Sequence, residues 1–126
     1  MLIVGDSIAF TLDLGLGEYQ GAYGVEAVNA GILGCGITNG AQFRQLGVDY
    51  PMAPQCANNL WPRIWLTDIA KEKPNVVMIL AGRWEVADRT YEGKWTSIEN
   101  PTYAAYVRHQ LESRSAWRAR VGRRSS

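Results

Sequence analysis

A serine that could act as a nucleophile follows a short apolar run at the start of the chain, in the stretch Gly5-Asp6-Ser7. A serine nucleophile needs an exposed hydroxyl, a base that accepts its proton, and donors around the oxyanion that develops on the substrate. The same three residues suit an ordinary strand-to-helix turn, because glycine adopts backbone angles that side chains forbid and Asp or Ser can cap a helix. The stretch by itself favours the ordinary turn and leaves the nucleophile as the alternative.

The elements that would position Ser7 follow from the hydrophobic pattern of the chain. We expect three strands, at residues 2–4, 25–31 and 75–82, and three helices, at residues 8–16, 62–73 and 102–112. The third strand reads as buried on both faces, because its apolar residues are continuous. Residues 37–58 read as a long polar loop, and we expect the first helix to end at the glycines that occupy positions 15, 17, 21 and 24.

Strands that alternate with helices predict a parallel sheet with right-handed crossovers, here a flavodoxin-like three-layer α/β sandwich with strand order 2-1-3. The carboxyl end of the central first strand is then a switch-point crevice, where open α/β sheets bind ligands. Ser7 would lie there between the loops after the second and third strands, "GILGCG" and "GRWE". The amides of Ser7 and Gly34 and a side-chain donor from "GRWE" could then surround one oxyanion, because glycine lets a carbonyl approach the backbone.

The three loops resemble the sequence blocks of a known family. "VGDS", "NAGILG" and the G-x-x-E turn at residues 82–85 resemble blocks one, two and three of the SGNH (GDSL-type) hydrolases. "AGRWEVADRTYEGKW", with Cys56, Trp61 and Trp65, is similar to the SGNH domain fused to membrane acyltransferase-3 proteins, bacterial O-acyltransferases that modify cell-surface glycans. The resemblance covers roughly residues 2–112. The i, i+4 spacing of the two tryptophans favours core packing over a platform for binding sugars.

The resemblance implies a role for four residues near the crevice. Ser7 matches the nucleophile, Asp6 the acid that helps shape the nucleophile turn, and Gly34 the oxyanion donor of the second block. Trp84 stands where the family has an asparagine; its indole N–H offers a donor, and a packed aromatic ring is the alternative. The resemblance also implies an acyl-enzyme on Ser7 and an acylated glycan or small acyl ester as substrate. The acyl group would pass to water or to a glycan hydroxyl.

The catalytic base of the family is not found in the sequence. That base is a histidine in a D-x-x-H motif after two further strands, and no such motif is present. The single histidine, His109, falls in a helical pattern, which favours a solvated helix position. We therefore expect residues 1–112 to form a partial SGNH hydrolase-like domain, incomplete at its C-terminus, and residues 113–126 to form a disordered arginine-rich tail. The alternative function is a non-catalytic glycan-binding or interaction module.

Cys35 and Cys56 are the only cysteines, and the residues alone leave open a disulfide or two buried thiols. The resemblance implies an extracytoplasmic domain in which these two cysteines can be bridged. It also implies an upstream membrane acyltransferase domain outside this chain. We expect no leader and no anchor within these residues, because the longest apolar run, residues 76–81, is far short of the roughly 20 residues that cross a bilayer.

Composition argues against several other classes of protein. The 126 residues are 47% hydrophobic and 20% charged, which is typical of a soluble globular domain. Residues 113–126 carry five arginines and no acid, but they lack the aromatic interleaving and the recognised module of a nucleic-acid binder. One histidine and no C-x-x-C spacing argue against a zinc site, and the glycine-rich stretches lack nucleotide motifs, so no metal or cofactor is expected.

Three charged residues follow the third predicted strand: Glu85, Asp88 and Arg89. They could line the cleft, but a surface ion pair is the more common explanation for such residues.

Overall fold

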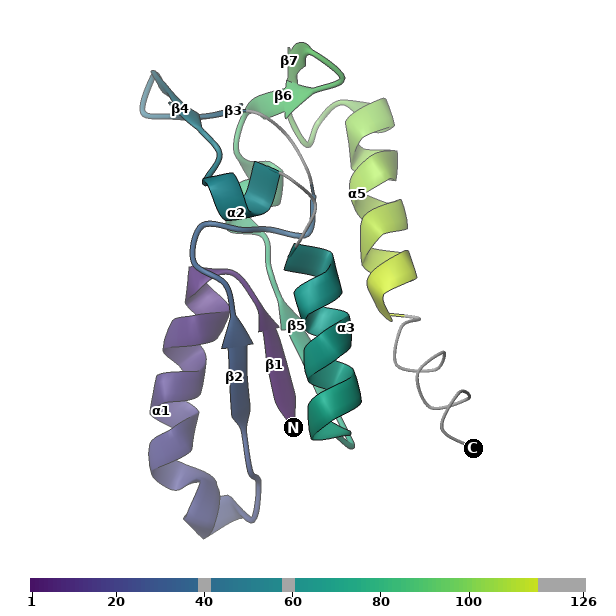
Figure 1. Cartoon of the computed structure of the whole chain (residues 1–126). Coiled ribbons are helices and arrows are strands. Elements are labelled where there is room, and N and C mark those ends of the chain that lie inside the picture. The colour runs from purple at the N-terminus through teal and green to yellow at the C-terminus, as the bar shows by residue number, and fades with distance from the viewer. Residues whose placement is uncertain (39–41, 58–60, 116–126) are drawn as a thin grey trace.

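The computed structural model covers the chain, and the structure is described for residues 1–38, 42–57 and 61–115 (Figure 1). The described residues form a mixed α/β protein, as predicted. Its elements are β1 (Leu2–Gly5), α1 (Ser7–Tyr23), β2 (Val28–Gly31), β3 (Gln42–Gln45), β4 (Val48–Pro51), α2 (Pro54–Ala57), α3 (Trp61–Glu72), β5 (Val77–Leu80), α4 (Arg83–Val86), β6 (Arg89–Tyr91), β7 (Lys94–Thr96) and α5 (Pro101–Ser115).

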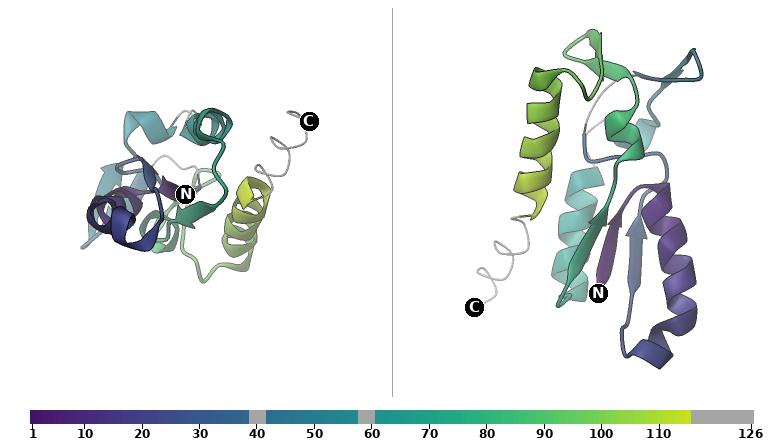
Figure 2. Two further views of the ribbon diagram at one scale, coloured as in Figure 1. Left: turned by 90° about the horizontal axis from the view of Figure 1, so that it is seen from below. Right: turned by 180° about the vertical axis from the view of Figure 1, so that it is seen from behind.

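The parallel sheet has the strand order β2-β1-β5, which is the predicted 2-1-3 order. All four residues of β1 pair in parallel with both neighbours. Helices α1 and α3 lie on opposite faces of this sheet (Figure 2). Leu2, Ile3 and Val4 are therefore covered from both faces and on both edges, and none is more than 1% exposed. Burial on every side explains why the continuous apolar run forms the central strand.

The main apolar cluster lies between β1 and α3 and extends to the loop after β2. Its buried members are Leu2, Val4, Cys35, Ile37, Met52, Cys56, Trp65 and Ile69. Trp65 is 1% exposed, so the predicted core packing is confirmed for this tryptophan. The side chain of Trp61 lies outside the described part of the structure.

Helix α1 is longer than predicted, because three of its glycines do not end it. It continues through Gly15, Gly17 and Gly21, which are exposed and have nothing within 4 Å of the position that a Cβ would occupy. Each of these glycines therefore lowers the stability of the helix only through its poor helix propensity, by roughly 1 kcal/mol relative to alanine. Gly24 does end the helix: it takes the left-handed conformation, φ +66°, and its amide donates to the Gln20 carbonyl. The packing of α1 on β1 and β2 outweighs the cost of the internal glycines.

The second strand is shorter than predicted, because the end of α1 binds the backbone before it. The Val25 amide donates to the Gln20 carbonyl (3.2 Å), and the Ala27 amide donates to the Gln20 side-chain Oε1 (3.1 Å). These amides are not free to join the sheet. β2 accordingly begins at Val28.

Strand β5 is also shorter than predicted, and the prediction that it is buried on both faces is wrong. Met78 is 36% exposed, and Val77 and Ile79 are half-buried against the apolar cluster. In the described part of the chain β5 pairs with β1 alone, so it forms an edge of the parallel sheet. Helix α1 packs mainly on β1 and β2, which leaves the β5 side of this face less covered.

Residues 37–58 were expected to form a loop, and this prediction is wrong for their middle part. β3 and β4 form a hairpin, and β3 also pairs with β6, which gives an antiparallel sheet of order β4-β3-β6-β7. The strand sequences "QFRQ" and "VDYP" are short and polar, and the pairing of Phe43 with Arg89 joins segments distant in sequence. The local hydrophobic pattern of the sequence does not predict strands of this kind. The second sheet lies beyond the carboxyl ends of the parallel strands (Figure 1).

Helices α3 and α5 lie close to the predicted residues 62–73 and 102–112. Asn100 caps α5, since its Oδ1 accepts the amides of Thr102 (3.0 Å) and Tyr103 (3.2 Å). Most of the predicted tail, residues 116–126, lies outside the described residues.

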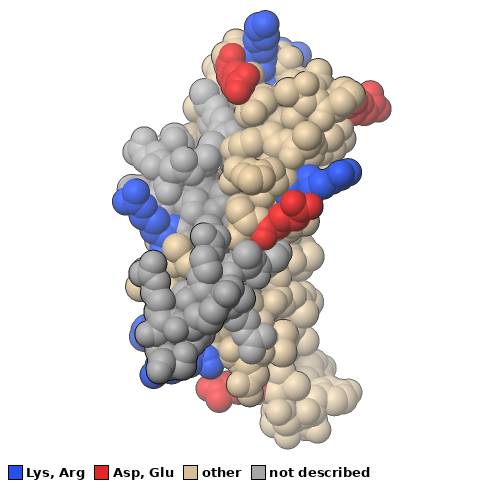
Figure 3. Space-filling view, turned by 90° about the vertical axis from the view of Figure 1, so that its right-hand side faces the viewer, with Lys and Arg blue, Asp and Glu red and all other residues tan. Residues whose placement is uncertain are grey.

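None of the described helices is long and apolar enough to cross a bilayer. On the face shown in Figure 3 the described surface is mostly uncharged, and basic and acidic side chains are scattered over it. That face therefore shows no concentrated basic patch among its described residues.

We expect the isolated chain to self-associate through apolar surface on α1 and the edge strand β5. Leu14 is 60% exposed and Tyr23 is 78% exposed, and exposed apolar surface beside an open strand edge favours association. Size-exclusion chromatography with light scattering should show an apparent mass that rises with concentration, and Leu14→Lys should lower it. A monodisperse monomer with a sharp cooperative thermal transition would contradict this expectation.

Alanine at Gly5 should destabilise the protein, whereas alanine at Gly15 should stabilise it. Gly5 has φ +145°, and a Cβ there would clash with the carbonyl oxygen of Leu80 on the neighbouring strand. We expect Gly5→Ala to lower the free energy of unfolding by about 2 kcal/mol, and Gly15→Ala to raise it by about 0.5–1 kcal/mol. Denaturant unfolding measures both values. Equal effects of the two substitutions would contradict the close approach of β1 to β5.

Candidate active site

Asp6 and Ser7 lie where the central strand turns into helix α1. Asp6 is fully buried and is the N-cap of α1, because its Oδ1 accepts the Ile8 amide at 2.9 Å. Ser7 is the half-buried first residue of the helix. The turn is therefore an ordinary N-cap, and it also holds a partly exposed serine at the carboxyl end of the central strand.

Two residues of β2 hold the first turns of α1 against the sheet. The Asn29 side-chain amide donates to the Phe10 carbonyl (3.0 Å), and its Oδ1 accepts the Gly31 amide (3.1 Å). A Cβ at Gly31 would lie 2.6 Å from the Phe10 nitrogen, so only glycine permits this approach. These contacts position the helix that begins at Ser7. The sequence alone did not predict these contacts. The available signal is "NAG", one polar and two small residues inside a predicted strand.

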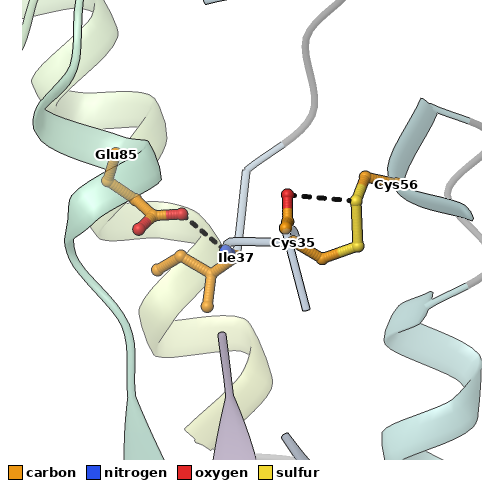
Figure 4. The surroundings of a disulfide bond; sticks show 5 residues. Cys35, Ile37, Cys56 and Glu85 are labelled. Atoms are coloured by element: carbon orange, nitrogen blue, oxygen red, sulfur yellow. Dashed lines mark hydrogen bonds between the residues drawn. A yellow bond between two sulfur atoms is a disulfide. The ribbon is translucent and has the colours of Figure 1, made fainter. Parts of the chain in front are cut away.

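Gly34 lies in the loop after β2, which a disulfide ties to α2. Gly34 has φ +79°, a backbone conformation that favours glycine. Cys35 is bonded to Cys56, with 5.3 Å between their Cα atoms. The Cys56 sulfur lies 3.2 Å from the Gly34 carbonyl oxygen, the pair joined by a dashed line in Figure 4. A disulfide sulfur has no proton, so in the oxidised protein this is a close contact, and only the reduced thiol would donate.

Trp84 stands on α4, directly after β5. Its half-buried ring packs edge-on against Phe43 of β3, with 4.7 Å between ring centroids and 82° between ring planes. The Arg83 guanidinium lies 5.4 Å from the centroid of the same ring. The indole Nε1 is buried and makes no hydrogen bond in the described structure. Trp84 is thus a packed aromatic residue that also has a free N–H donor.

Glu85 and Arg89 are buried, so the prediction that they form a surface ion pair is wrong. Glu85 is 3% exposed and Arg89 is fully buried, whereas Asp88 is exposed. The Arg89 guanidinium donates to the Trp84 carbonyl (3.0 Å) and to Thr38 Oγ1. The i, i+4 spacing of Glu85 and Arg89 is typical of an exposed helical pair. Their burial follows from the pairing of β6 with β3, which no local pattern shows.

Burial raises the pKa of the Glu85 carboxyl above its ordinary value, although the Ile37 amide and the Arg89 charge act in the opposite direction. A raised pKa in the folded state means that folding favours the neutral form. Glu85 therefore contributes stability that is present below the ordinary pKa of glutamate and is lost as the pH rises through the raised value.

No described contact supplies the Ser7 hydroxyl with a histidine base. His109 is exposed on α5. Helix α5 lies on the β5 side of the molecule, whereas the helix that begins at Ser7 packs on β1 and β2 (Figures 1 and 2). Within the described ranges no group of three or more His, Cys, Asp and Glu could hold a metal ion.

A pocket of about 330 Å³ lies at the opposite end of the parallel sheet from Ser7. Its lining is almost entirely apolar and comes from the start of β1, the end of α1 and the segment before β2: Met1, Leu16, Tyr19, Gln20, Tyr23, Val25 and Ala27. It contains none of the predicted site residues. The candidate active site is therefore at the carboxyl end of the strands, where the loops carrying Ser7, Gly34 and Trp84 follow β1, β2 and β5 (Figure 1).

Removal of the disulfide should destabilise the oxidised protein. The bridge spans a sequence separation of 21, and closing a loop of this size contributes about 3 kcal/mol by restricting the unfolded chain. We expect Cys56→Ala to lower the free energy of unfolding by about that amount in denaturant titrations. The difference from wild type should largely vanish in a reducing agent. Equal stability of wild type with and without reductant would contradict a stabilising bridge, and peptide mapping without reduction checks that the bridge is formed.

A known protein family matches most of this chain. The model of the SGNH domain (fused to AT3 domains) matches residues 1–124 of the chain. No curated protein and no solved structure gives a significant match. Because the family model spans nearly the whole sequence, this chain belongs to the family of SGNH domains that are fused to AT3 domains.

Proposed function

We propose that the chain is an SGNH-type serine acyl-ester hydrolase or O-acyltransferase domain that acts on acylated cell-surface glycans. SGNH domains in general carry hydrolase and acyltransferase chemistry. The observation that carries the proposal is the place of Ser7, which is half-buried at the carboxyl end of the central strand of a parallel sheet. Ligands of open α/β sheets bind in this position. The same proposal takes the complete fold to be a flavodoxin-like three-layer sandwich.

The proposed reaction begins with attack of the Ser7 oxygen on an acyl carbonyl. A bond forms between this oxygen and the acyl carbon, the serine proton passes to a base, and the carbonyl oxygen becomes an oxyanion. The Ser7 amide, the Gly34 amide and the Trp84 indole N–H are the proposed donors to that oxyanion. The oxyanion then re-forms the carbonyl, the bond between the acyl carbon and the ester oxygen breaks, and the alcohol leaves with the proton that the base returns. Water or a glycan hydroxyl attacks the acyl-enzyme next and frees Ser7.

The general base is the missing part of this machinery. The sequence has no D-x-x-H motif, and its single histidine is exposed on α5. We therefore take these 126 residues to supply the nucleophile and the oxyanion donors but not the histidine. On the precedent of serine hydrolases, loss of one triad member lowers the rate by several orders of magnitude and leaves the contribution of the oxyanion donors.

The proposed compartment is extracytoplasmic, and the proposed partner is a membrane acyltransferase domain. The family model describes fusion to AT3 domains, which supports such a partner. The disulfide between Cys35 and Cys56 supports an oxidising compartment, because disulfides persist in secreted and periplasmic proteins and are rare in the cytosol.

Added imidazole should restore acyl transfer that depends on Ser7. With p-nitrophenyl acetate, we expect imidazole to raise the Ser7-dependent rate by up to about 10²-fold, the lower end of what a positioned general base contributes. The Ser7-dependent rate is the difference between wild type and Ser7→Ala at the same imidazole concentration, which removes hydrolysis by imidazole itself. Mass spectrometry of the quenched reaction should find one acetyl group on Ser7.

A non-catalytic glycan-binding or interaction module is the alternative, and exposed aromatic rings on the second sheet favour it. Tyr50 is 43% exposed, and Trp95 is 39% exposed with the Arg44 guanidinium 4.1 Å from its ring centroid. Such rings offer an apolar face beside polar groups. Identical rates for wild type and Ser7→Ala at every imidazole concentration, with no acetylated Ser7, would reject the enzyme and leave the binding module.

A further inference from the structure

Glu85 is a buried carboxylate that joins α4 to the loop after β2. Its Oε1 accepts the Ile37 amide at 2.6 Å, and Figure 4 shows the side chain reaching from α4 to this loop. A Cβ at Gly36 would clash with the same oxygen and would lie 2.9 Å from the Trp84 Cβ. The helix that carries Trp84 therefore packs directly on the backbone of the loop that carries Gly34. Glycine at position 36 is what permits this approach.

Both sides of this contact are themselves held in place. On the α4 side, the fully buried Tyr103 hydroxyl of α5 donates to the Glu85 carbonyl at 3.0 Å. Arg89 spans the two sides, because its guanidinium donates to the Trp84 carbonyl (3.0 Å) and to Thr38 Oγ1. Glu85 is thus one member of a buried network rather than an isolated acid, and hydrogen bonding of such groups stabilises one arrangement.

Two of the contacts that hold the loop lie on opposite sides of it in Figure 4. Cys35 joins it to α2 through the disulfide, and Ile37 joins it to α4 through Glu85. Gly34 precedes the first of these contacts. Loss of the Glu85 contact would leave the disulfide and the hydrogen bond from Arg89 to Thr38, and it would loosen the loop at Ile37 relative to Trp84.

We propose that Glu85 is a positioning residue, whose carboxylate sets the separation between the Gly34 amide and the Trp84 indole so that both can reach one oxyanion. This inference rests on the proposed function. Glu85 itself touches neither substrate nor Ser7 in the proposed reaction. A misplacement of about 1 Å at a reacting group can cost roughly 10²-fold in rate, so a buried contact of this kind has a measurable effect on turnover.

The test compares Glu85→Ala with Glu85→Gln and with Glu99→Ala, a control at an exposed glutamate. Glutamine keeps an oxygen that accepts the Ile37 amide and removes the cost of a buried charge, so this variant should fold. Amide hydrogen exchange at Ile37, followed by NMR, reports the contact without any activity. We expect exchange to accelerate by about 10- to 10²-fold in Glu85→Ala and to remain slow in Glu85→Gln and in the control.

The Ser7-dependent rate with imidazole gives the second readout. We expect kcat to fall by about 10²-fold in Glu85→Ala with KM unchanged, because the donors act on the transition state, and to recover in Glu85→Gln. If Glu85→Ala does not fold, the test relies on Glu85→Gln. Fast exchange of the Ile37 amide or a large loss of the Ser7-dependent kcat in this folded variant would overturn the inference. The inference is also overturned if Glu85→Ala folds and shows the same Ile37 exchange rate and the same kcat as wild type. Absence of Ser7-dependent turnover in wild type instead rejects the proposed function, while the exchange data still test the contact.

Discussion

Hydrogen bonding of β1 along both of its edges holds the fold and the candidate site together. The strand is four residues long, and each residue pairs with β2 on one side and with β5 on the other. Parallel pairing directs the three strands the same way, so the loops that follow them lie at one end of the sheet. Gly5 makes the β5 pairing close at that end, because no side chain separates its Cα from the Leu80 carbonyl. Ser7 follows Gly5 by two residues and begins helix α1.

The loops at this end are fastened by different chemistry. The start of α1 is held by the Asp6 cap and by Asn29 of β2, which bind backbone groups of the helix. The loop of Gly34 is held by a covalent bridge and by a buried acid. Helix α4 is held by Arg89 and by Tyr103, whose side chains reach its carbonyls. Oxyanion stabilisation requires donors that are held in place before the reaction, and the proposed donors lie on these fastened elements.

Burial of Glu85 and Arg89 carries a desolvation cost that hydrogen bonds must offset. Both residues bind backbone or hydroxyl groups instead of forming a surface pair. Glu85 joins α4 to the loop after β2, and Arg89 of β6 joins both of these segments to the second sheet. The second sheet thereby forms part of the support of the site as well as a cover beyond the strand ends (Figure 1). Buried polar side chains of this kind cost free energy, but their hydrogen bonds favour a single packing arrangement. We expect them where the geometry of a site matters for function.

Sequence alone determined the order of the parallel strands, the helices α3 and α5, and the place of Ser7 after the central strand. These depend on apolar runs, on proline and asparagine at helix starts, and on chain connectivity, all of which are local. Tertiary structure decided the second sheet, the continuation of α1 through Gly15 and Gly17, and the burial of Glu85 and Arg89. Each of these depends on a partner distant in sequence, such as Arg89 opposite Phe43. A short polar strand or a helical glycine has no local advantage, and only packing against such partners supplies the free energy that stabilises it.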